Sequence, residues 1–295
     1  MQQESIYITE GEEQLHLRHI WQRKGGVPIF MLHGLIENGF IFYTEKGKGL
    51  ACYLAEQGFD VYVADLRGRG KSLPAINSQS TFGQHETITC DIALFLEKIQ
   101  SINPQKMHLI AHSWGGVLIS SFLARYPKWL DKVYSKTCFG TKRVVTAKTM
   151  EAYFKLGFMW RYIAPILAKK NGYFDAKKFR FGSDSETKKS LEESITWVIP
   201  GKWHDLNDGF DYYTAAQNIT WPPTWHLTGI SDYALGHQQD VQLFIDECNN
   251  RNAKFSVLSK QAGNQVNYDH INILTHPNTV NDHFPKLALW LKGFS

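Results

Sequence analysis

The chain has 295 residues, 43% of them hydrophobic, and its 32 Lys and Arg against 28 Asp and Glu give a formal net charge of +4. This length supports one large core. The chain has no run of about 18 apolar residues, which a membrane span would need, and its N-terminus lacks the apolar segment of a secretory signal. We therefore expect a soluble, cytoplasmic protein, and we do not expect nucleic acid binding, because no basic cluster is interleaved with aromatic residues in a known pattern.

The first part of the chain predicts a hairpin followed by buried strands. Residues 5–9 and 15–21 have strand character and are separated by an acidic turn with a glycine, so they indicate an antiparallel hairpin. Residues 27–32 are almost wholly apolar, which is typical of a parallel strand that is covered on both faces. A predicted helix at 47–58 then leads into a similar strand at 60–64. This alternation favours an α/β fold with a mostly parallel, doubly wound sheet.

Ser113 lies in the turn between a predicted strand and a predicted helix. The strand is the apolar run at 107–112, and the helical pattern covers 116–125. A strand that runs directly into a helix makes a sharp turn, which holds the serine Oγ clear of the backbone. The G-x-S-x-G pattern of such turns has its second glycine at Gly115, whereas Ala111 replaces the first glycine.

The α/β rhythm is interrupted once. It stops after a predicted strand at 132–139 and resumes near residue 224, and the residues between carry helix-like stretches that are rich in aromatic side chains. We therefore predict a helical cap at 141–215, inserted into one α/β core that is formed by residues 1–140 and 216–295.

The predicted cap carries the excess of positive charge. It has 13 Lys and Arg against 9 Asp and Glu, with 19 of each elsewhere in the chain. A solvated surface explains this excess, and so does peripheral contact with an anionic lipid surface or an anionic substrate. The cap aromatics either pack against one another or line a substrate pocket, and we name Trp160, Trp197 and Trp203 as candidate substrate-binding residues.

Three chemically complementary side chains each follow a predicted strand. Ser113 follows the strand just described, Asp232 follows a strand at 224–227, and His270 lies in the loop after a strand at 254–258. The carboxyl ends of parallel strands meet at one edge of a sheet, so these side chains should lie together. A serine hydroxyl needs a base within hydrogen-bonding distance, and that base needs an orienting acid. We predict that Ser113, His270 and Asp232 fill these roles.

Other histidines and carboxylates fit the roles of base and acid less well. His276 precedes a proline at a helix entry and His283 lies inside the closing helix, so neither has the free loop position of a base. Asp240 and Asp246 belong to the predicted helix after Asp232.

Over nearly its whole length the chain resembles the α/β-hydrolase superfamily, in which the catalytic residues occur in the order Ser, Asp, His. The matching pieces are His33-Gly34-Leu35, the glycine-rich turn at 65–72, Ala111-His112-Ser113-Trp114-Gly115, Gly229-Ile230-Ser231-Asp232 and Asp269-His270. Three pieces look more narrowly like the lipase, lysophospholipase and monoacylglycerol lipase side of the superfamily: His33-Gly34-Leu35 with Asn38, the run at 50–63, and Tyr268-Asp269-His270.

The resemblance implies a serine hydrolase that cleaves carboxylic esters through an acyl-serine intermediate. Its oxyanion hole would be the backbone N–H groups of Leu35 and Trp114. A small-molecule or lipid acyl ester is the expected substrate, and no obligate protein partner is evident. Thioester cleavage, C–C bond hydrolysis, acyl transfer and a catalytically silent ligand-binding protein stay open as alternatives.

The residue pattern gives no reason to expect a cofactor or a metal. His33 and His112 flank the site, but neither takes part in a zinc-ligand spacing, and we expect them to hold loops by hydrogen bonds. We expect Arg67 to tie down its own turn rather than to touch substrate. The scattered cysteines fit reduced core thiols rather than a disulfide framework. They are Cys52, Cys90, Cys138 and Cys248.

Overall fold

The computed structural model describes residues 1–295, and its centre is an eight-stranded sheet in the order β1-β2-β4-β3-β5-β6-β9-β10. The strands are β1 (Gln2–Glu10), β2 (Glu13–Trp21), β3 (Pro28–Leu32), β4 (Asp60–Asp65), β5 (Met107–His112), β6 (Val133–Phe139), β9 (Thr224–Gly229) and β10 (Lys254–Leu258). β2 pairs antiparallel with both β1 and β4, and every other pair of neighbours is parallel. The predicted hairpin and the mostly parallel sheet are thus confirmed.

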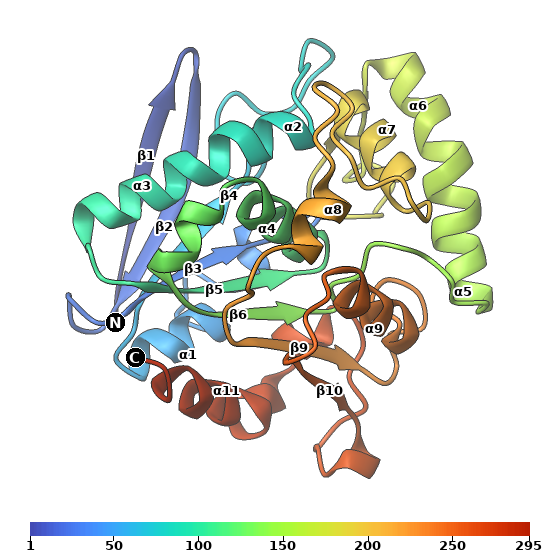
Figure 1. Cartoon of the computed structure of the whole chain (residues 1–295). Helices are drawn as coiled ribbons and strands as arrows, with labels where there is room; N and C mark the ends of the chain where they lie inside the picture. Colours follow the sequence, from blue (N-terminus) through green and yellow to red (C-terminus); the bar gives the residue numbers. More distant parts are fainter.

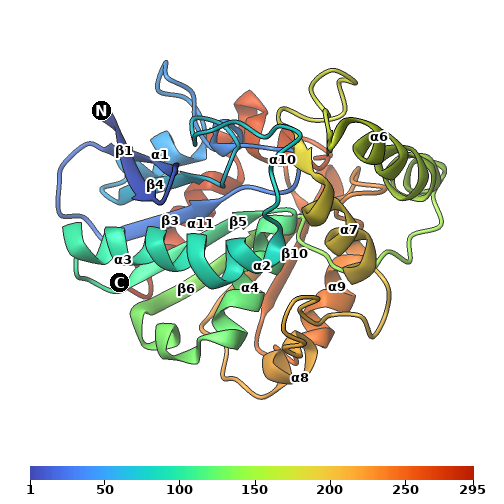
Figure 2. The same ribbon diagram turned by 90° about the horizontal axis from the view of Figure 1, so that it is seen from above.

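Helices cover both faces of this sheet (Figure 1). The α-helices of the core are α1 (Leu50–Glu56), α2 (Gln84–Glu86), α3 (Ile92–Ile102), α4 (Trp114–Arg125), α9 (Gln238–Glu247), α10 (Asn272–Thr275) and α11 (His283–Lys292). The shorter 3₁₀ and π turns are η1 (Gly39–Ile41), η2 (Thr87–Asp91), η3 (Pro127–Lys132), η5 (Lys260–Ala262) and η6 (Pro277–Asn281). Buried residues of α3, α4 and α9 share one apolar cluster, and those of α1 and α11 share another. The helices that carry the two clusters lie on opposite sides of the sheet, as Figure 2 shows from above.

The central strands and their helices follow the hydrophobic pattern of the sequence. Every residue of β3, β4 and β5 is buried, as expected for strands that helices cover on both faces. α3 is amphipathic, and the residues of its buried stripe are Ile92, Phe95, Leu96 and Ile99. The parallel strands point the same way, so the loops that carry the predicted site residues meet at one edge. None of the helices has both the length and the apolar character needed to cross a membrane.

The chain between β6 and β9 extends beyond this carboxyl edge (Figures 1 and 2). Its elements are α5 (Met150–Ala152), the π-helix η4 (Tyr153–Ile163), α6 (Ala164–Asn171), β7 (Tyr173–Phe174), β8 (Glu186–Thr187), α7 (Lys188–Trp197) and α8 (Tyr212–Gln217). The sequence indicated the helices but not the small antiparallel pair β7-β8. Trp160 and Phe174 belong to a separate small core, whereas Trp197 and Tyr212 belong to the main core. We keep the word cap for residues 141–215.

Candidate active site

Ser113 occupies a strained turn between β5 and α4. Its φ of 52° and ψ of −127° lie outside the regions that non-glycine residues favour, and such a conformation costs about 1–3 kcal/mol. The turn is held from β6, because the Ser113 N–H donates to the carbonyl oxygen of Phe139 at 2.7 Å. The chain here therefore has the sharp strand-to-helix geometry that the sequence predicted.

The small residues around Ser113 allow this turn to pack closely. A Cβ at Gly115 would lie 2.5 Å from the carbonyl oxygen of His33, so a side chain there would push α4 away from the loop after β3. Ala111, which replaces the first glycine of the pattern, is fully buried in β5 and pairs with Leu32 and Cys138. An alanine is therefore compatible with this turn.

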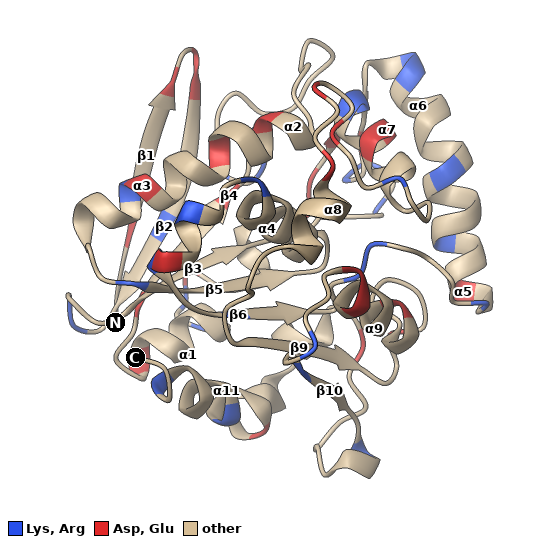
Figure 3. Ribbon diagram, viewed as in Figure 1, with Lys and Arg blue, Asp and Glu red and all other residues tan.

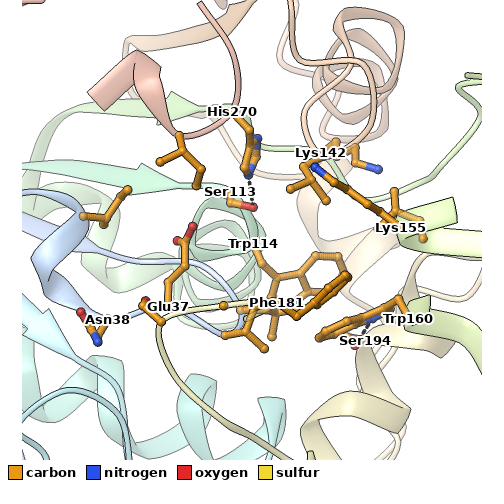
Figure 4. Close-up of a pocket in the computed structure, with 18 of the residues that line it drawn as sticks. Glu37, Asn38, Ser113, Trp114, Lys142, Lys155, Trp160, Phe181, Ser194 and His270 are labelled. Carbon is orange, nitrogen blue, oxygen red and sulfur yellow. Dashed lines mark hydrogen bonds between the residues drawn. The ribbon is translucent and has the colours of Figure 1, made fainter. Parts of the chain in front are cut away.

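The loops after β9 and β10 bring Asp232 and His270 to Ser113. His270 Nε2 lies 2.9 Å from Ser113 Oγ (Figure 4), and its Nδ1 lies 2.6 Å from Asp232 Oδ2. A carboxylate can only accept, so Nδ1 carries the proton and Nε2 is free to accept the serine proton. The three predicted residues thus form one hydrogen-bonded chain.

The surroundings of Asp232 keep its carboxylate charged. Burial alone would raise the pKa of Asp232, but the charge of His270 and its hydrogen bond hold that pKa below its ordinary value. The second carboxylate oxygen accepts the N–H of Leu235 at 2.9 Å. Gly140, with a φ of 57°, lets β6 end close to His270, since a Cβ there would lie 2.9 Å from the imidazole.

The two predicted oxyanion donors border the same space as Ser113. Leu35 lies in the loop after β3, and its N–H donates to no group of the protein. Trp114 is the first residue of α4, where backbone N–H groups have no acceptor within the helix. Both residues line the cavity that contains Ser113 and His270, and their role as oxyanion donors stays a prediction.

Glu37 is a site residue that the sequence analysis missed. Its Oε2 accepts from His112 Nδ1 at 2.8 Å and from the Gly34 N–H at 3.0 Å. His112 Nε2 donates to the carbonyl oxygen of His270 at 2.9 Å, which confirms that His112 holds a loop. The Glu37 carboxylate and the His270 carbonyl oxygen both favour a proton on the ring, and although burial opposes it they raise the pKa of His112 above its ordinary value. Burial opposes ionisation of Glu37, but His112 lowers its pKa to about 2.

A cavity of about 590 Å³ opens over Ser113 and His270 (Figure 4). Most of its wall is apolar, and the larger apolar residues include Phe40, Leu156, Trp160, Phe181 and Val198. Trp160 lines the cavity, and its indole Nε1 donates to Ser194 Oγ at 3.2 Å. Its role in substrate binding stays a prediction.

Trp197 and Trp203 do not line this cavity, and their prediction as substrate-binding residues is wrong. Each is 1% exposed and belongs to the main core. Trp197 Nε1 donates to the His204 carbonyl oxygen at 2.9 Å, and Trp203 Nε1 donates to Ser121 Oγ at 3.0 Å. The indole N–H groups of both residues have hydrogen-bond acceptors inside the protein. These side chains therefore pack the cap against the core and do not contact a ligand.

The competing histidines and carboxylates lie where the sequence placed them. His276 is the N-cap of η6, and His283 begins α11 with its Nε2 bonded to a backbone carbonyl. Asp240 and Asp246 lie in α9. None of these four residues lines the cavity.

His33 and Arg67 are also structural. His33 Nε2 accepts the N–H of Leu66 at 3.1 Å, which joins the loops after β3 and β4 as expected. Arg67 differs in detail from the expectation. The Arg67 guanidinium bonds Asp91 of η2 and Glu13 of β2. It therefore connects the turn after β4 to these two elements and makes no bond within the turn.

Two groups of side chains have the composition of a metal site, but their ligand atoms are already engaged. One is the Glu37 cluster, in which both nitrogens of His112 are hydrogen-bonded. The other joins His85, Asp205 and Asp208, and there the Arg125 guanidinium bonds both aspartates. The cysteines are free thiols as expected, although Cys90 is only half-buried.

Comparison with known proteins identifies a family. The family model described as alpha/beta hydrolase fold matches residues 27–192. Probable lysophospholipase L2 of Haemophilus influenzae is 28% identical over 127 residues, which cover 43% of this chain and 40% of that protein. Lysophospholipase L2 of Escherichia coli is 32% identical over 108 residues, which cover 36% of this chain and 30% of that protein. The chain therefore matches well under half the length of these relatives.

Solved structures share the whole fold. A soluble variant of monoglyceride lipase from Saccharomyces cerevisiae, solved with a substrate analogue, superposes with a TM-score of 0.69 and 18% identity. The superposition covers 100% of this chain and 97% of the yeast chain. The likeness extends over the cap as well as the core.

Proposed function

The chain belongs to the alpha/beta hydrolase fold family, and on this premise we propose that it is a serine hydrolase of carboxylic esters that acts through an acyl-serine intermediate. The observation that carries the proposal is the hydrogen-bonded chain of Ser113, His270 and Asp232 beneath an apolar cavity. Serine at the turn provides an oxygen nucleophile, and the histidine beside it provides the base that this nucleophile requires.

The geometry supports a two-step reaction. Ser113 Oγ attacks the ester carbonyl carbon while His270 Nε2 takes the hydroxyl proton, and the N–H groups of Leu35 and Trp114 stabilise the oxyanion. His270 then gives that proton to the departing alkoxide, and the acyl group stays on Ser113. Water repeats the sequence with His270 as base, which releases the carboxylic acid and restores the serine.

An apolar acyl chain is the substrate part that fits the cavity best. Its wall offers aromatic and aliphatic surface on the side of Trp160 and Phe181, and such surface is favourable for buried methylenes. The names of the relatives, lysophospholipase and monoglyceride lipase, support a lipid ester. A panel of acyl esters of graded length, run with matched thioesters and with product analysis, tests this proposal. Turnover of esters to acid and alcohol supports it, whereas no turnover and no fluorophosphonate labelling would indicate a silent binding protein.

Trp160→Ala is expected to lower kcat/KM more for long acyl chains than for short ones. Each methylene that loses its contact costs about 0.8 kcal/mol, or about fourfold in rate. The control is Trp129→Ala, because Trp129 is a half-buried indole in η3 that does not line the cavity. Equal losses at all chain lengths, matching the control, would contradict the role of Trp160.

We also propose that the outer face of the cap contacts an anionic lipid surface. Large apolar side chains are exposed along the helix formed by α5, η4 and α6: Met150 (87%), Tyr153 (78%), Phe154 (58%), Phe158 (48%), Tyr162 (59%) and Ile166 (64%). Exposed Arg161, Lys169 and Lys170 lie on the same helix, and Figure 3 shows basic residues along α6. Apolar and basic side chains on one helix suit the interface of an anionic bilayer.

Phe154→Ser is expected to weaken binding to vesicles of phosphatidylglycerol and phosphatidylcholine by about tenfold, since an aromatic ring leaves the interface. Binding of the unaltered protein should also fall as salt rises, because salt screens the lysines. Tyr7→Ser is the matched control, since Tyr7 is a 46% exposed aromatic on β1, away from the cap. Hydrolysis of a soluble short ester should not change. Vesicle binding that neither the Phe154 change nor salt affects would contradict the proposed surface.

A further inference from the structure

Ile36, the residue after the predicted oxyanion donor Leu35, has a strained backbone. Its φ of 51° lies in the left-handed region, which β-branched residues almost never adopt. A conformation of this kind costs about 1–3 kcal/mol and persists only where surrounding contacts impose it. The contacts that hold Ile36 therefore constrain the chain directly after Leu35.

Those contacts come from the cap. The Asp184 N–H donates to the Ile36 carbonyl oxygen at 2.9 Å, and the Ile36 N–H approaches Glu186 Oε2 at 3.5 Å. Gly182 packs directly on the same residue, since a Cβ there would lie 2.5 Å from Ile36 O and 2.7 Å from Ile36 Cβ. Both backbone polar groups of Ile36 are thus bound by the segment that leads into β8.

This cap segment is itself anchored to the core. Glu186 is fully buried and forms an ion pair with Arg69, which lies in the turn after β4. Asp184 is 3% exposed, and its Oδ2 accepts from Asn38 Nδ2 at 3.0 Å and from the Gly70 N–H at 2.7 Å. Two buried carboxylates therefore fix the segment against the turn after β4 and against Asn38, which lies in the loop that borders Ser113.

We propose that cap residues 182–186 complete the oxyanion site, because they hold Ile36 in its left-handed conformation and so keep the Leu35 N–H directed into the cavity. The inference rests on the proposed hydrolase function. Asp184 and Glu186 do not line the cavity and are then positioning residues, which act on the reaction through Ile36 and Leu35. Gly182 lines the cavity, and its part in this proposal is its close packing on Ile36. The cap contributes to transition-state stabilisation, and a displaced cap leaves the site with a single oxyanion donor.

Gly182→Ala tests the inference directly, because the new methyl group must displace Ile36. Loss of one oxyanion donor typically costs 10² to 10³ in kcat, so a displaced donor is expected to lower kcat by about tenfold or more. KM for a long-chain ester should change by less than about threefold, since the large apolar side chains of the wall, such as Trp160 and Phe181, are unchanged. The affinity of an alkyl boronic acid, which forms a tetrahedral adduct with a serine, should fall by the same factor as kcat/KM.

Two further variants make the test decisive. Gly157→Ala is the matched control, because the atoms nearest to the new methyl group lie 3.9 Å away. This variant should leave kcat and boronate affinity unchanged. Asp184→Asn weakens the anchor without adding volume, so it should show a smaller loss with the same split between kcat and KM. If Gly182→Ala does not fold, Asp184→Asn decides the question.

The outcomes separate this inference from the function on which it rests. Absence of ester turnover and of fluorophosphonate labelling in the unaltered protein would refute the proposed hydrolase. Normal turnover in the unaltered protein with unchanged kcat in both cap variants would refute only the role of residues 182–186. A change confined to KM, or a lower melting temperature at unchanged kcat, would show that the segment has a purely structural role.

Discussion

Replacing Ser113 with alanine is expected to lower kcat for carboxylic esters by roughly 10⁴- to 10⁶-fold and to abolish covalent labelling by a fluorophosphonate. The variant keeps the cavity and both predicted oxyanion donors, so weak residual turnover above the uncatalysed rate is expected. It loses the atom that would form the acyl ester, so no acyl-enzyme should accumulate. Mass spectrometry of the labelled peptide, together with single-turnover kinetics, provides the measurement.

Ser5 provides a matched control for this result. Its Oγ lies 2.9 Å from His16 Nε2, and His16 Nδ1 lies 2.7 Å from Asp65 Oδ2. The protein therefore contains a second chain of serine, histidine and aspartate with nearly the same distances. Ser5 lies on the exposed strand β1, however, with neither a following helix N-terminus nor a place in the cavity wall.

The comparison of the two serines tests which features produce reactivity. Ser5→Ala should leave labelling and turnover unchanged, because a base without an oxyanion site and a bound substrate gives little acceleration. A label that maps to Ser5, or a Ser113→Ala protein that is still labelled at the normal rate, would contradict the assignment of the nucleophile.

The sequence predicts the core of this fold well because the core obeys local rules. β3 is a continuous apolar run and β5 is largely apolar, and each is followed by a turn with small or polar residues. The pair β7-β8 was not predicted, because each strand has two residues and shows no alternation that a pattern could reveal. The carboxylates that follow β7, Asp184 and Glu186, bind residues more than 100 positions earlier in the chain, and no local pattern reveals such contacts.

The distinction between local patterns and long-range contacts also explains which residues of the site could be predicted. Ser113, Asp232 and His270 could be named because each follows a parallel strand, and topology alone brings strand ends together. Trp197 and Trp203 could not be assigned correctly, since an aromatic residue in a cap has the same local pattern whether it faces a cavity or the core. The roles of Glu37 and Ile36 depend on partners 75 to 150 residues away, at His112 and Glu186.

Asp232→Asn is expected to lower kcat by about 10⁴-fold while the protein stays folded and keeps its affinity for substrate. Asn can offer its NH₂ group to His270 Nδ1, and the ring then carries its proton on Nε2, where it can no longer accept from Ser113. The carboxylate also stabilises the imidazolium that forms when His270 takes the serine proton. Since His270 holds the pKa of Asp232 below its ordinary value, the native carboxylate stays charged at neutral pH and this stabilisation is available.

The control for Asp232→Asn is Asp246→Asn, because Asp246 is an exposed carboxylate on α9 that bonds only Gln242. Its removal should leave kcat, KM and labelling unchanged. Labelling of Asp232→Asn should be slow but should still map to Ser113, since the nucleophile remains. Equal activity of the two variants would mean that another group orients His270. A kcat that falls only in Asp232→Asn, at constant KM, is the result that the hydrogen-bonded chain requires.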